Sequence, residues 1–210
     1  MVQPIDNLSV FEHFGLLVVK NFLDAELCRK IRAEVRSTND RELAEVYANK
    51  EGQYVVDETV RKTQQTQVSN ATESLVKNRL MTLKPRLERH FYLSSTVCEG
   101  VNFLHYKQGG FYCPHQDNIN AETDAPTLLK QRQISIIIFL NGESEASYPD
   151  CYGGGALVFY GLLKDPALAH VSVPLKGETG LLVAFPSHLF HEVESVTYGE
   201  RFTIVSWFLQ

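Results

Sequence analysis

The chain has only four cysteines among its 210 residues, and no two of them form a Cys-x-x-Cys pair. This scarcity argues against both a disulfide framework and a structural zinc site, which need paired or clustered cysteines. Scattered thiols are typical of proteins that stay reduced inside the cell, so we expect a cytoplasmic location. The four residues are Cys28, Cys98, Cys113 and Cys151.

Long apolar segments and an excess of positive charge are also missing. No apolar run approaches the ~20 residues of a membrane span. The N-terminal stretch MVQPIDNLSVFEHFG lacks the basic start and apolar centre of a secretory signal. The formal net charge of −5 argues against a general nucleic-acid binder, because phosphate binding needs a basic surface. We therefore expect neither a membrane nor a nucleic acid as partner, and the sequence gives no signal for an oligomeric state.

Internal repeats, low-complexity tracts and linkers are absent as well. A chain of this length most simply forms one domain with a sizeable core, so we expect residues 1–210 to be a single domain. Within it, residues 1–97 have the pattern of a helical support region and residues 98–210 that of a β-rich core.

The support region contains two predicted helices, preceded by a strand candidate in the apolar run LLVVK (residues 16–20). Asp24 is placed to cap the first helix, along which apolar side chains recur every four residues. A second helix begins near Ser69 or Asn70, and Pro85 should end or kink it. The apolar positions of the first helix are Leu23, Leu27, Ile31 and Val35.

Two polar segments are candidate lids over a site. Residues 37–67 carry the loop signals STND and NKEGQ, with an extended stretch predicted at VRKTQQTQV. The loop NINAETDAPTLLKQ covers residues 118–131.

From Cys98 onward the chain changes to short β-prone runs separated by turn signals. About eight such runs predict a sandwich or a barrel, and hence a mainly β fold of the α+β class. The runs are VNFLHY, GGFYCPH, QISIIIFLN, GGGALVFYG, HVSVPL, GLLVAFP, LFHEVESV and RFTIVSWF.

His115 and Asp117, in FYCPHQD, and His191, in PSHLFHEV, all fall within this β-rich half. The side chains of residues i and i+2 of a strand point the same way, so His115 and Asp117 can bind one ion if this segment is extended. Two imidazoles and one carboxylate leave further coordination positions open, which suits a redox-active iron(II).

An H-x-D triplet alone is a weak motif, and other residues compete for the metal. His188 lies three residues before His191 and is the rival third ligand. His105 should point away from the face of its neighbour Tyr106. Cys113 falls on the same predicted face as His115, although a thiolate would favour a softer metal.

Taken in order along the chain, these residues resemble the iron(II)- and 2-oxoglutarate-dependent dioxygenases, in their prolyl 4-hydroxylase-like (PKHD-type) branch. The resemblance covers roughly Phe103 to Phe208, with a weaker echo in VVKNFLDAELCRKI. It implies a double-stranded β-helix, a jelly-roll or cupin-like barrel with flanking N-terminal helices. It also implies iron(II), 2-oxoglutarate and O2, with ascorbate as a further candidate.

The resemblance assigns roles to individual positions. His115, Asp117 and His191 match the family's metal ligands. Arg201 matches the basic residue that binds the distal carboxylate of 2-oxoglutarate, a role that suits the planar fork of a guanidinium. Tyr106 matches a tyrosine near the same co-substrate. GGALVF (Gly154 to Phe159) matches a glycine pair that enters a barrel strand.

This chain also departs from the family pattern. Phe139 and Leu157 stand where many relatives carry a tyrosine or a threonine that can bind the distal carboxylate. Their presence puts more weight on Arg201, Tyr106 and Ser135 as the residues that hold 2-oxoglutarate.

The implied activity is hydroxylation of an unactivated C–H bond. Tyr112 and Arg132 match substrate-contacting positions of prolyl hydroxylases, and Trp207 is expected to line the same interior. A prolyl residue of a peptide or protein is therefore the leading substrate. A free amino acid or a natural-product small molecule would use the same iron site. A non-catalytic cupin-like metal or small-molecule binder and an oxygen-sensing protein stay open as another class.

Overall fold

The computed structural model describes residues 8–48, 53–94, 96–119, 125–163, 165–168 and 170–210. Its helices are α1 (Ser9–His13), α2 (Ala25–Ser37), α3 (Asn70–Phe91) and α4 (Thr127–Gln131), with a 3-10 turn at Pro166–Leu168. Its strands are β1 (Leu17–Val19), β2 (Arg41–Leu43), β3 (Val46–Ala48), β4 (Gln53–Val55), β5 (Arg61–Lys62), β6 (Gln64–Thr66), β7 (Val97–Tyr106), β8 (Phe111–His115), β9 (Arg132–Phe139), β10 (Tyr152–Gly154), β11 (Leu157–Tyr160), β12 (Ser172–Leu175), β13 (Leu182–Pro186), β14 (His191–Val193), β15 (Val196–Gly199) and β16 (Arg201–Leu209).

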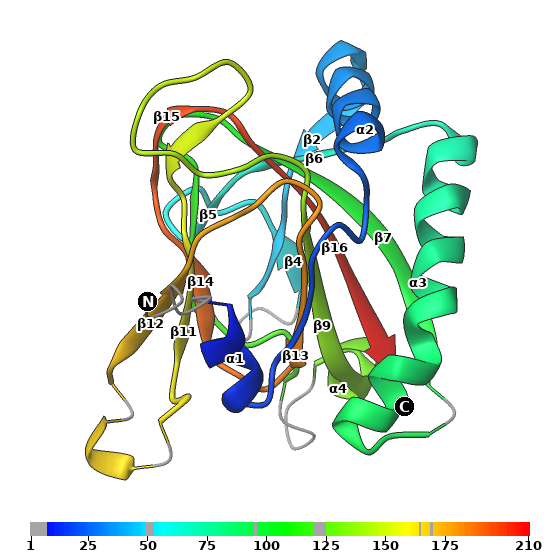
Figure 1. Ribbon diagram of the computed structural model, residues 1–210, viewed down its shortest axis with the longest axis vertical. Helices are drawn as coiled ribbons and strands as arrows, with labels where there is room; N and C mark the ends of the chain where they lie inside the picture. Colours follow the sequence, from blue (N-terminus) through cyan, green and yellow to red (C-terminus); the bar gives the residue numbers. More distant parts are fainter. Residues whose placement is uncertain (1–7, 49–52, 95, 120–124, 164, 169) are drawn as a thin grey trace, which may run out of the picture.

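Two antiparallel sheets form the walls of a flattened barrel (Figure 1). The larger sheet has the strand order β1-β13-β9-β16-β7-β6-β2, and the smaller sheet the order β12-β11-β14-β8-β5. Strand neighbours are mostly distant in sequence, so closure of the barrel brings far-apart segments together. The expected mainly β fold is confirmed.

Alternating side chains of β9 divide the core into two layers. Ile136 and Ile138 face outward and pack with the buried side chains of α2 and α3. Ile137 and Phe139 face inward and pack with residues of β11, β12 and β13. Figure 1 shows α3 alongside β7 on the outer side of the large sheet. The helices therefore support one sheet from outside while the barrel interior stays available for a site.

The two long helices begin where the sequence predicts. The Asp24 side chain accepts a hydrogen bond of 2.8 Å from the Leu27 amide at the start of α2. The Ser69 hydroxyl accepts one of 3.3 Å from the Thr72 amide at the start of α3. Each cap satisfies an amide that would otherwise have no partner inside the helix. The predicted strand at residues 16–20 is also present, as β1.

Pro85 does not end the second helix, so that alternative of the prediction is wrong. The helix α3 continues through Pro85 to Phe91. Pro85 is exposed, while Leu80 before it and Leu87 after it are fully buried against the large sheet. Because tertiary packing holds the helix on both sides of the proline, it outweighs the loss of one backbone hydrogen bond.

The polar segment 37–67 is more ordered than its composition indicates. The extended stretch predicted at VRKTQQTQV is present as β5 and β6. β2 and β6 extend the large sheet, β5 pairs with β8 of the small sheet, and β3 pairs with β4 as a hairpin. Of the two candidate lids, residues 49–52 and 120–124 lie outside the described residues.

No helix in the described part of the chain combines the length and the apolar character that crossing a membrane requires.

Candidate metal centre

The strand pairing of β8 with β14 brings two histidines face to face. His115 ends β8, His191 begins β14, and the two residues are partners in the ladder between these strands. Asp117 follows β8 by two residues, and its amide donates a 3.0 Å hydrogen bond to the carbonyl oxygen of Ser187. Backbone hydrogen bonds thus fix the main chain at all three positions.

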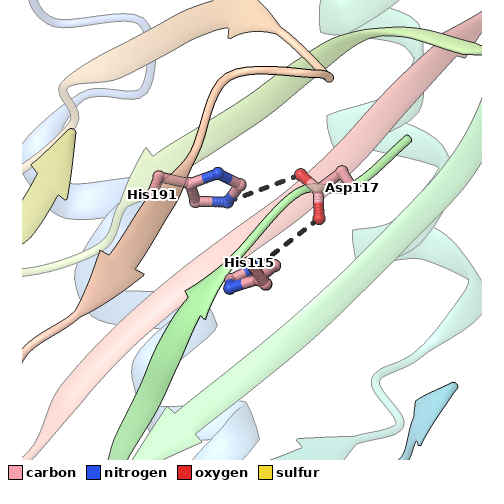
Figure 2. Close-up of side chains that lie close together, drawn as sticks. All are labelled: His115, Asp117 and His191. Carbon is pink, nitrogen blue, oxygen red and sulfur yellow. Dashed lines mark ion pairs between the residues drawn. The ribbon is translucent and has the colours of Figure 1, made fainter. Parts of the chain in front are cut away.

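The three side chains converge on one point (Figure 2). Nε2 of His115 lies 3.6 Å from Oδ1 of Asp117, and Nε2 of His191 lies 3.6 Å from Oδ2 of the same carboxylate. One ligand atom from each residue lies within 4.8 Å of the others. Such spacing fits a single ion held by two imidazoles and one carboxylate, because metal–ligand bonds to these atoms are about 2 Å long.

Hydrogen bonds orient both imidazole rings. Nδ1 of His115 lies 2.8 Å from the carbonyl oxygen of Cys113, and Nδ1 of His191 lies 2.9 Å from that of Leu189. A carbonyl oxygen only accepts, so each Nδ1 carries the proton and each Nε2 presents its lone pair to the shared point. This is the tautomer that a metal-binding histidine needs.

The protonation states also suit a divalent cation. Burial alone would raise the pKa of Asp117, but His191, His115 and the Ser135 hydroxyl hold that pKa well below its usual range. Burial and the neighbouring His115 ring lower the pKa of His191 to about 4. At neutral pH the site therefore contains a carboxylate and a neutral His191 imidazole, the forms that bind metals.

Ser135 lies next to Asp117, the carboxylate of the candidate metal centre. Its hydroxyl donates a 2.6 Å hydrogen bond to Oδ2 of Asp117 and lies 3.0 Å from the hydroxyl of Ser187. The sequence assigns Ser135 to 2-oxoglutarate, whereas the structure places it where it orients Asp117. Ser187 was not singled out by the sequence, in which no motif marks it.

A bulge next to His115 changes which residues of β8 face the site. The pairing with β14 shifts between His191 and Val193, which puts an extra residue into β8 near the exposed Pro114. Tyr112 therefore stacks on the His115 ring, with centroids 3.6 Å apart. Cys113, predicted to share the face of His115, instead directs its thiol to the Thr59 carbonyl at 3.7 Å.

The other rivals for the metal also lie apart from it. His188 is exposed, and its carbonyl accepts a hydrogen bond from the Gln116 side chain. His105 faces away from its neighbour Tyr106, as expected, and its Nε2 lies 2.7 Å from Glu200 Oε1. Neither belongs to the metal-binding group found among the described residues.

Arg201 is a buried cation that forms no salt bridge in the described part of the structure, although the Glu143 carboxylate is near enough to interact with it electrostatically. It is 1% exposed, and its Nε and Nη2 atoms make no hydrogen bond there. Its guanidinium lies among three aromatic rings, with Cζ 5.0 Å from Tyr106, 5.2 Å from Phe139 and 6.0 Å from Tyr152. Burying an unpaired charge is costly, so this position is built for an anion.

A cavity of about 840 Å³ opens from the metal-binding residues. Tyr106 lines it and also contacts the Arg201 guanidinium, so the anion position adjoins the cavity. Part of the wall comes from the support region, namely Glu42 to Tyr47 together with Tyr54, Val55, Asp57, Val60 and Arg61. The predicted substrate residues Tyr112, Arg132 and Trp207 line it as well.

Arg132 is already engaged by two neighbours. Its guanidinium lies 3.6 Å from the centroid of the Trp207 ring and forms hydrogen bonds of 2.7 and 2.5 Å with the Glu99 carboxylate. Glu99 belongs to no sequence motif, so its place in this wall was not predicted. The three residues form one preorganised wall of the cavity.

Comparison with known proteins identifies the family. A model described as the 2OG-Fe(II) oxygenase superfamily matches residues 101–209. The chain therefore belongs to the 2OG-Fe(II) oxygenase superfamily, whose members use iron(II), 2-oxoglutarate and O2. The described His115–Asp117–His191 cluster is compatible with the iron.

Curated relatives support the expected branch. A PKHD-type hydroxylase of Thermosynechococcus vestitus is 31% identical over 116 residues, which cover 55% of this chain and 45% of the relative. A PKHD-type hydroxylase of Parvibaculum lavamentivorans is 35% identical over 103 residues, or 49% of this chain and 38% of the relative. The matched segments thus span less than half the length of these relatives.

Solved structures agree on the fold. A prolyl-4-hydroxylase of Pseudomonas putida superposes with a TM-score of 0.67 at 23% identity, covering 97% of this chain and 96% of that one. A prolyl hydroxylase of Trichoplax adhaerens, solved with a peptide fragment of the hypoxia inducible factor oxygen degradation domain, gives 0.68 at 18% identity, covering 96% and 86%. The expected double-stranded β-helix is confirmed.

Proposed function

We propose that this chain is an iron(II)- and 2-oxoglutarate-dependent dioxygenase that hydroxylates an unactivated C–H bond. The observation that carries the proposal is the presence, in one barrel, of the His115–Asp117–His191 cluster and of the buried, unpaired Arg201. A metal binder without a co-substrate has no need of a buried cation that awaits an anion.

Each residue has a distinct task in this proposal. His115, Asp117 and His191 hold iron(II) and leave other coordination positions open. Arg201 binds the distal carboxylate of 2-oxoglutarate, and Tyr106 packs between that position and the cavity. When bound, the metal and its co-substrate supply the oxidising power for hydroxylation with O2, and 2-oxoglutarate leaves as succinate and carbon dioxide. The barrel walls shield this chemistry from water.

The proposed substrate is a prolyl residue in a peptide or protein. Tyr112, Arg132 and Trp207 line the cavity that also contains the three proposed metal ligands, and Arg132 contacts both Trp207 and Glu99. The solved prolyl hydroxylases with the same fold favour this choice. A free amino acid or a natural-product small molecule is the alternative substrate class.

We further propose that residues 1–210 act as one domain. Strands β2 and β6 of the support region extend the large sheet, and β5 extends the small one. The support region would thus complete the barrel rather than form a separate unit.

An anaerobic titration tests the proposed function. Metal-free protein is given iron(II) and then 2-oxoglutarate, and the visible spectrum is followed for a charge-transfer band. We expect a band that needs both additions and that is lost in Arg201→Ala and His191→Ala. If folded, iron-loaded protein gives no band, the oxygenase proposal fails and a cupin-like metal binder takes its place.

A further inference from the structure

A second buried polar group lies beside Arg201 without a hydrogen-bond partner in the described part of the structure. Tyr152, the first residue of β10, is 0% exposed, and its hydroxyl makes no hydrogen bond there. The Nε and Nη2 atoms of Arg201 are also buried and make no hydrogen bond there. Buried hydroxyl and guanidinium groups rarely stay unsatisfied, because each loses its bonds to water on burial. The nearby Glu143 carboxylate does not satisfy them, because its Oε2 atom also makes no hydrogen bond there. Three donors without a partner, close to one another, therefore indicate a shared acceptor that is still to bind.

The surrounding backbone fixes the Tyr152 side chain in this place. The Tyr152 amide donates to the Gly142 carbonyl at 3.2 Å, and the Tyr152 carbonyl accepts from the Ser144 amide at 2.8 Å. A Cβ atom at Gly177 would collide with the Tyr152 hydroxyl, so the absence of a side chain there makes room for it. The hydroxyl position is therefore built into the fold.

The glycine pair of the GGALVF motif leaves room for the side chains of Arg201 and Tyr152. A Cβ atom at Gly155 would lie 3.1 Å from Cδ of Arg201 and 3.4 Å from Cε2 of Tyr152. Gly155 also has a φ of +64°, which favours glycine. The absence of a side chain at Gly155 thus lets Arg201 and Tyr152 approach each other.

The Tyr152 hydroxyl is a neutral hydrogen-bond donor. Burial raises the pKa of Tyr152 to about 12, although the Arg201 cation opposes the shift. The phenol therefore keeps its proton at neutral pH and can donate it to a carboxylate oxygen. Glu143 is a bridge partner of Tyr152, but no hydrogen bond joins its carboxylate to the hydroxyl.

We propose that Tyr152 donates a hydrogen bond to the same carboxylate that Arg201 binds, the distal carboxylate of 2-oxoglutarate. This inference rests on the proposed function and adds a co-substrate residue to it. Phe139, on β9, has no hydroxyl to offer, and the edge of its ring adjoins the same Gly177 space as the Tyr152 hydroxyl. In this proposal, Tyr152 on β10 supplies the hydroxyl group that Phe139 on β9 lacks.

Binding measurements with Tyr152→Phe test the inference without turnover. The dissociation constant of 2-oxoglutarate is measured by calorimetry on protein loaded with Mn(II), and 2-oxobutyrate, which lacks the distal carboxylate, serves as the reference ligand. We expect the variant to bind 2-oxoglutarate about 10- to 100-fold more weakly, the loss typical of one hydrogen bond to a charged group. Binding of 2-oxobutyrate should not change.

The matched control is Tyr160→Phe. Its hydroxyl already bonds to the Glu192 carboxylate and has no contact with Arg201, so this variant should bind both ligands as the parent does. Equal affinity of the parent and Tyr152→Phe for 2-oxoglutarate would overturn the inference. A parent protein that binds no 2-oxoglutarate at all would instead overturn the proposed function, so the two failures are distinct.

A second variant covers the case in which Tyr152→Phe does not fold. Gly177→Ala keeps the hydroxyl in the chain but displaces it, because the added methyl group would occupy its place. We expect the same selective loss of 2-oxoglutarate affinity. Unchanged binding of both ligands by a folded Gly177→Ala protein would contradict the inference.

Discussion

The Ser135 hydroxyl donates a 2.6 Å hydrogen bond to Oδ2 of Asp117, which links the middle of β9 to the carboxylate of the candidate metal centre. The same hydroxyl lies 3.0 Å from that of Ser187, whose carbonyl holds the Asp117 main chain. Side chain and backbone of Asp117 are thus both positioned by residues that do not touch the metal. Such partners set the direction of a ligand's lone pairs and hence the affinity of a metal site.

Ser135→Ala should therefore weaken metal binding while leaving the ligands in place. We expect a loss of about 10-fold in affinity, at the low end of the range seen when such supporting residues are removed. The measurement is competition for Mn(II) or iron(II) against a chelator. Ser206→Ala is the control, because the Ser206 hydroxyl bonds to the Gly100 carbonyl away from the site. Equal affinity of Ser135→Ala and parent would show that the hydrogen bond is dispensable.

Removal of a metal ligand should have a larger effect. We expect His115→Ala and Asp117→Ala to lose bound iron and to abolish 2-oxoglutarate turnover, because two ligands hold a divalent ion much more weakly than three. Metal content after gel filtration and succinate release are the two readouts. His188→Ala should keep both, since His188 lies apart from the described cluster. Turnover that survives in either ligand variant would refute the metal site.

The wall formed by Glu99, Arg132 and Trp207 predicts a fluorescence signal. The chain has one tryptophan, and the Arg132 guanidinium lies 3.6 Å from its ring. Arg132→Ala should shift the emission spectrum, because a cation no longer covers the ring. Its 2-oxoglutarate affinity should stay within about twofold of the parent, since additivity holds for sites without shared partners. An unchanged spectrum would mean that the stacking does not persist in solution.

Pro85 offers a test of stability. Pro85→Ala should raise the free energy of unfolding by about 2 kcal/mol, because alanine restores a helical hydrogen bond and proline costs about 3 kcal/mol inside a helix. The smaller entropy of the unfolded proline chain offsets part of the gain. Pro85 is exposed, so little packing is lost. Urea denaturation followed by circular dichroism measures the change, and a variant less stable than the parent would contradict the expectation.

His105 should make stability depend on pH. Burial lowers the pKa of His105 below its usual value of 6.5, although Glu200 opposes the shift and Lys107 and Arg41 add to it. The unfolded chain therefore binds more protons than the folded one just below pH 6.5, so the free energy of unfolding falls as the pH falls through that range. His105→Gln should flatten this slope in metal-free protein.

Urea denaturation of both proteins between about pH 5 and about pH 7.5 would measure the two slopes. His191 shifts in the same direction as His105. The difference between parent and variant therefore isolates the His105 contribution. If the free energy of unfolding changed with pH equally in both proteins, the pKa of His105 would not differ between the folded and unfolded states.

The sequence was sufficient to predict the features that local periodicity controls. The β-prone run QISIIIFLN predicted β9, capping side chains marked the starts of α2 and α3, and the spacing of His115 and Asp117 predicted that both side chains point the same way. The grouping of His191 with them came from the family resemblance, since nothing local indicates which distant strand pairs with β8. Resemblance also singled out Arg201, whose burial no local pattern reveals.

The remaining features depend on long-range contacts. The β8 bulge turns Cys113 away and brings Tyr112 onto His115, which strict strand alternation does not anticipate. Glu99, Ser187 and Tyr152 carry no motif, and each acquires its place from a strand distant in sequence. Pro85 shows the opposite case, in which a strong local preference is overcome by packing of the whole helix.

The pairing of His115 with His191 across one rung of the β8–β14 ladder has a consequence for the refolding chain. A slip of one residue in that ladder would turn one histidine to the opposite side of the sheet. The metal can therefore bind only after β8 and β14 have paired in the correct register. This pairing is slow, because a long loop must close before the two strands come into contact. During refolding, the recovery of metal affinity should lag behind the recovery of helical signal and report when the small sheet closes.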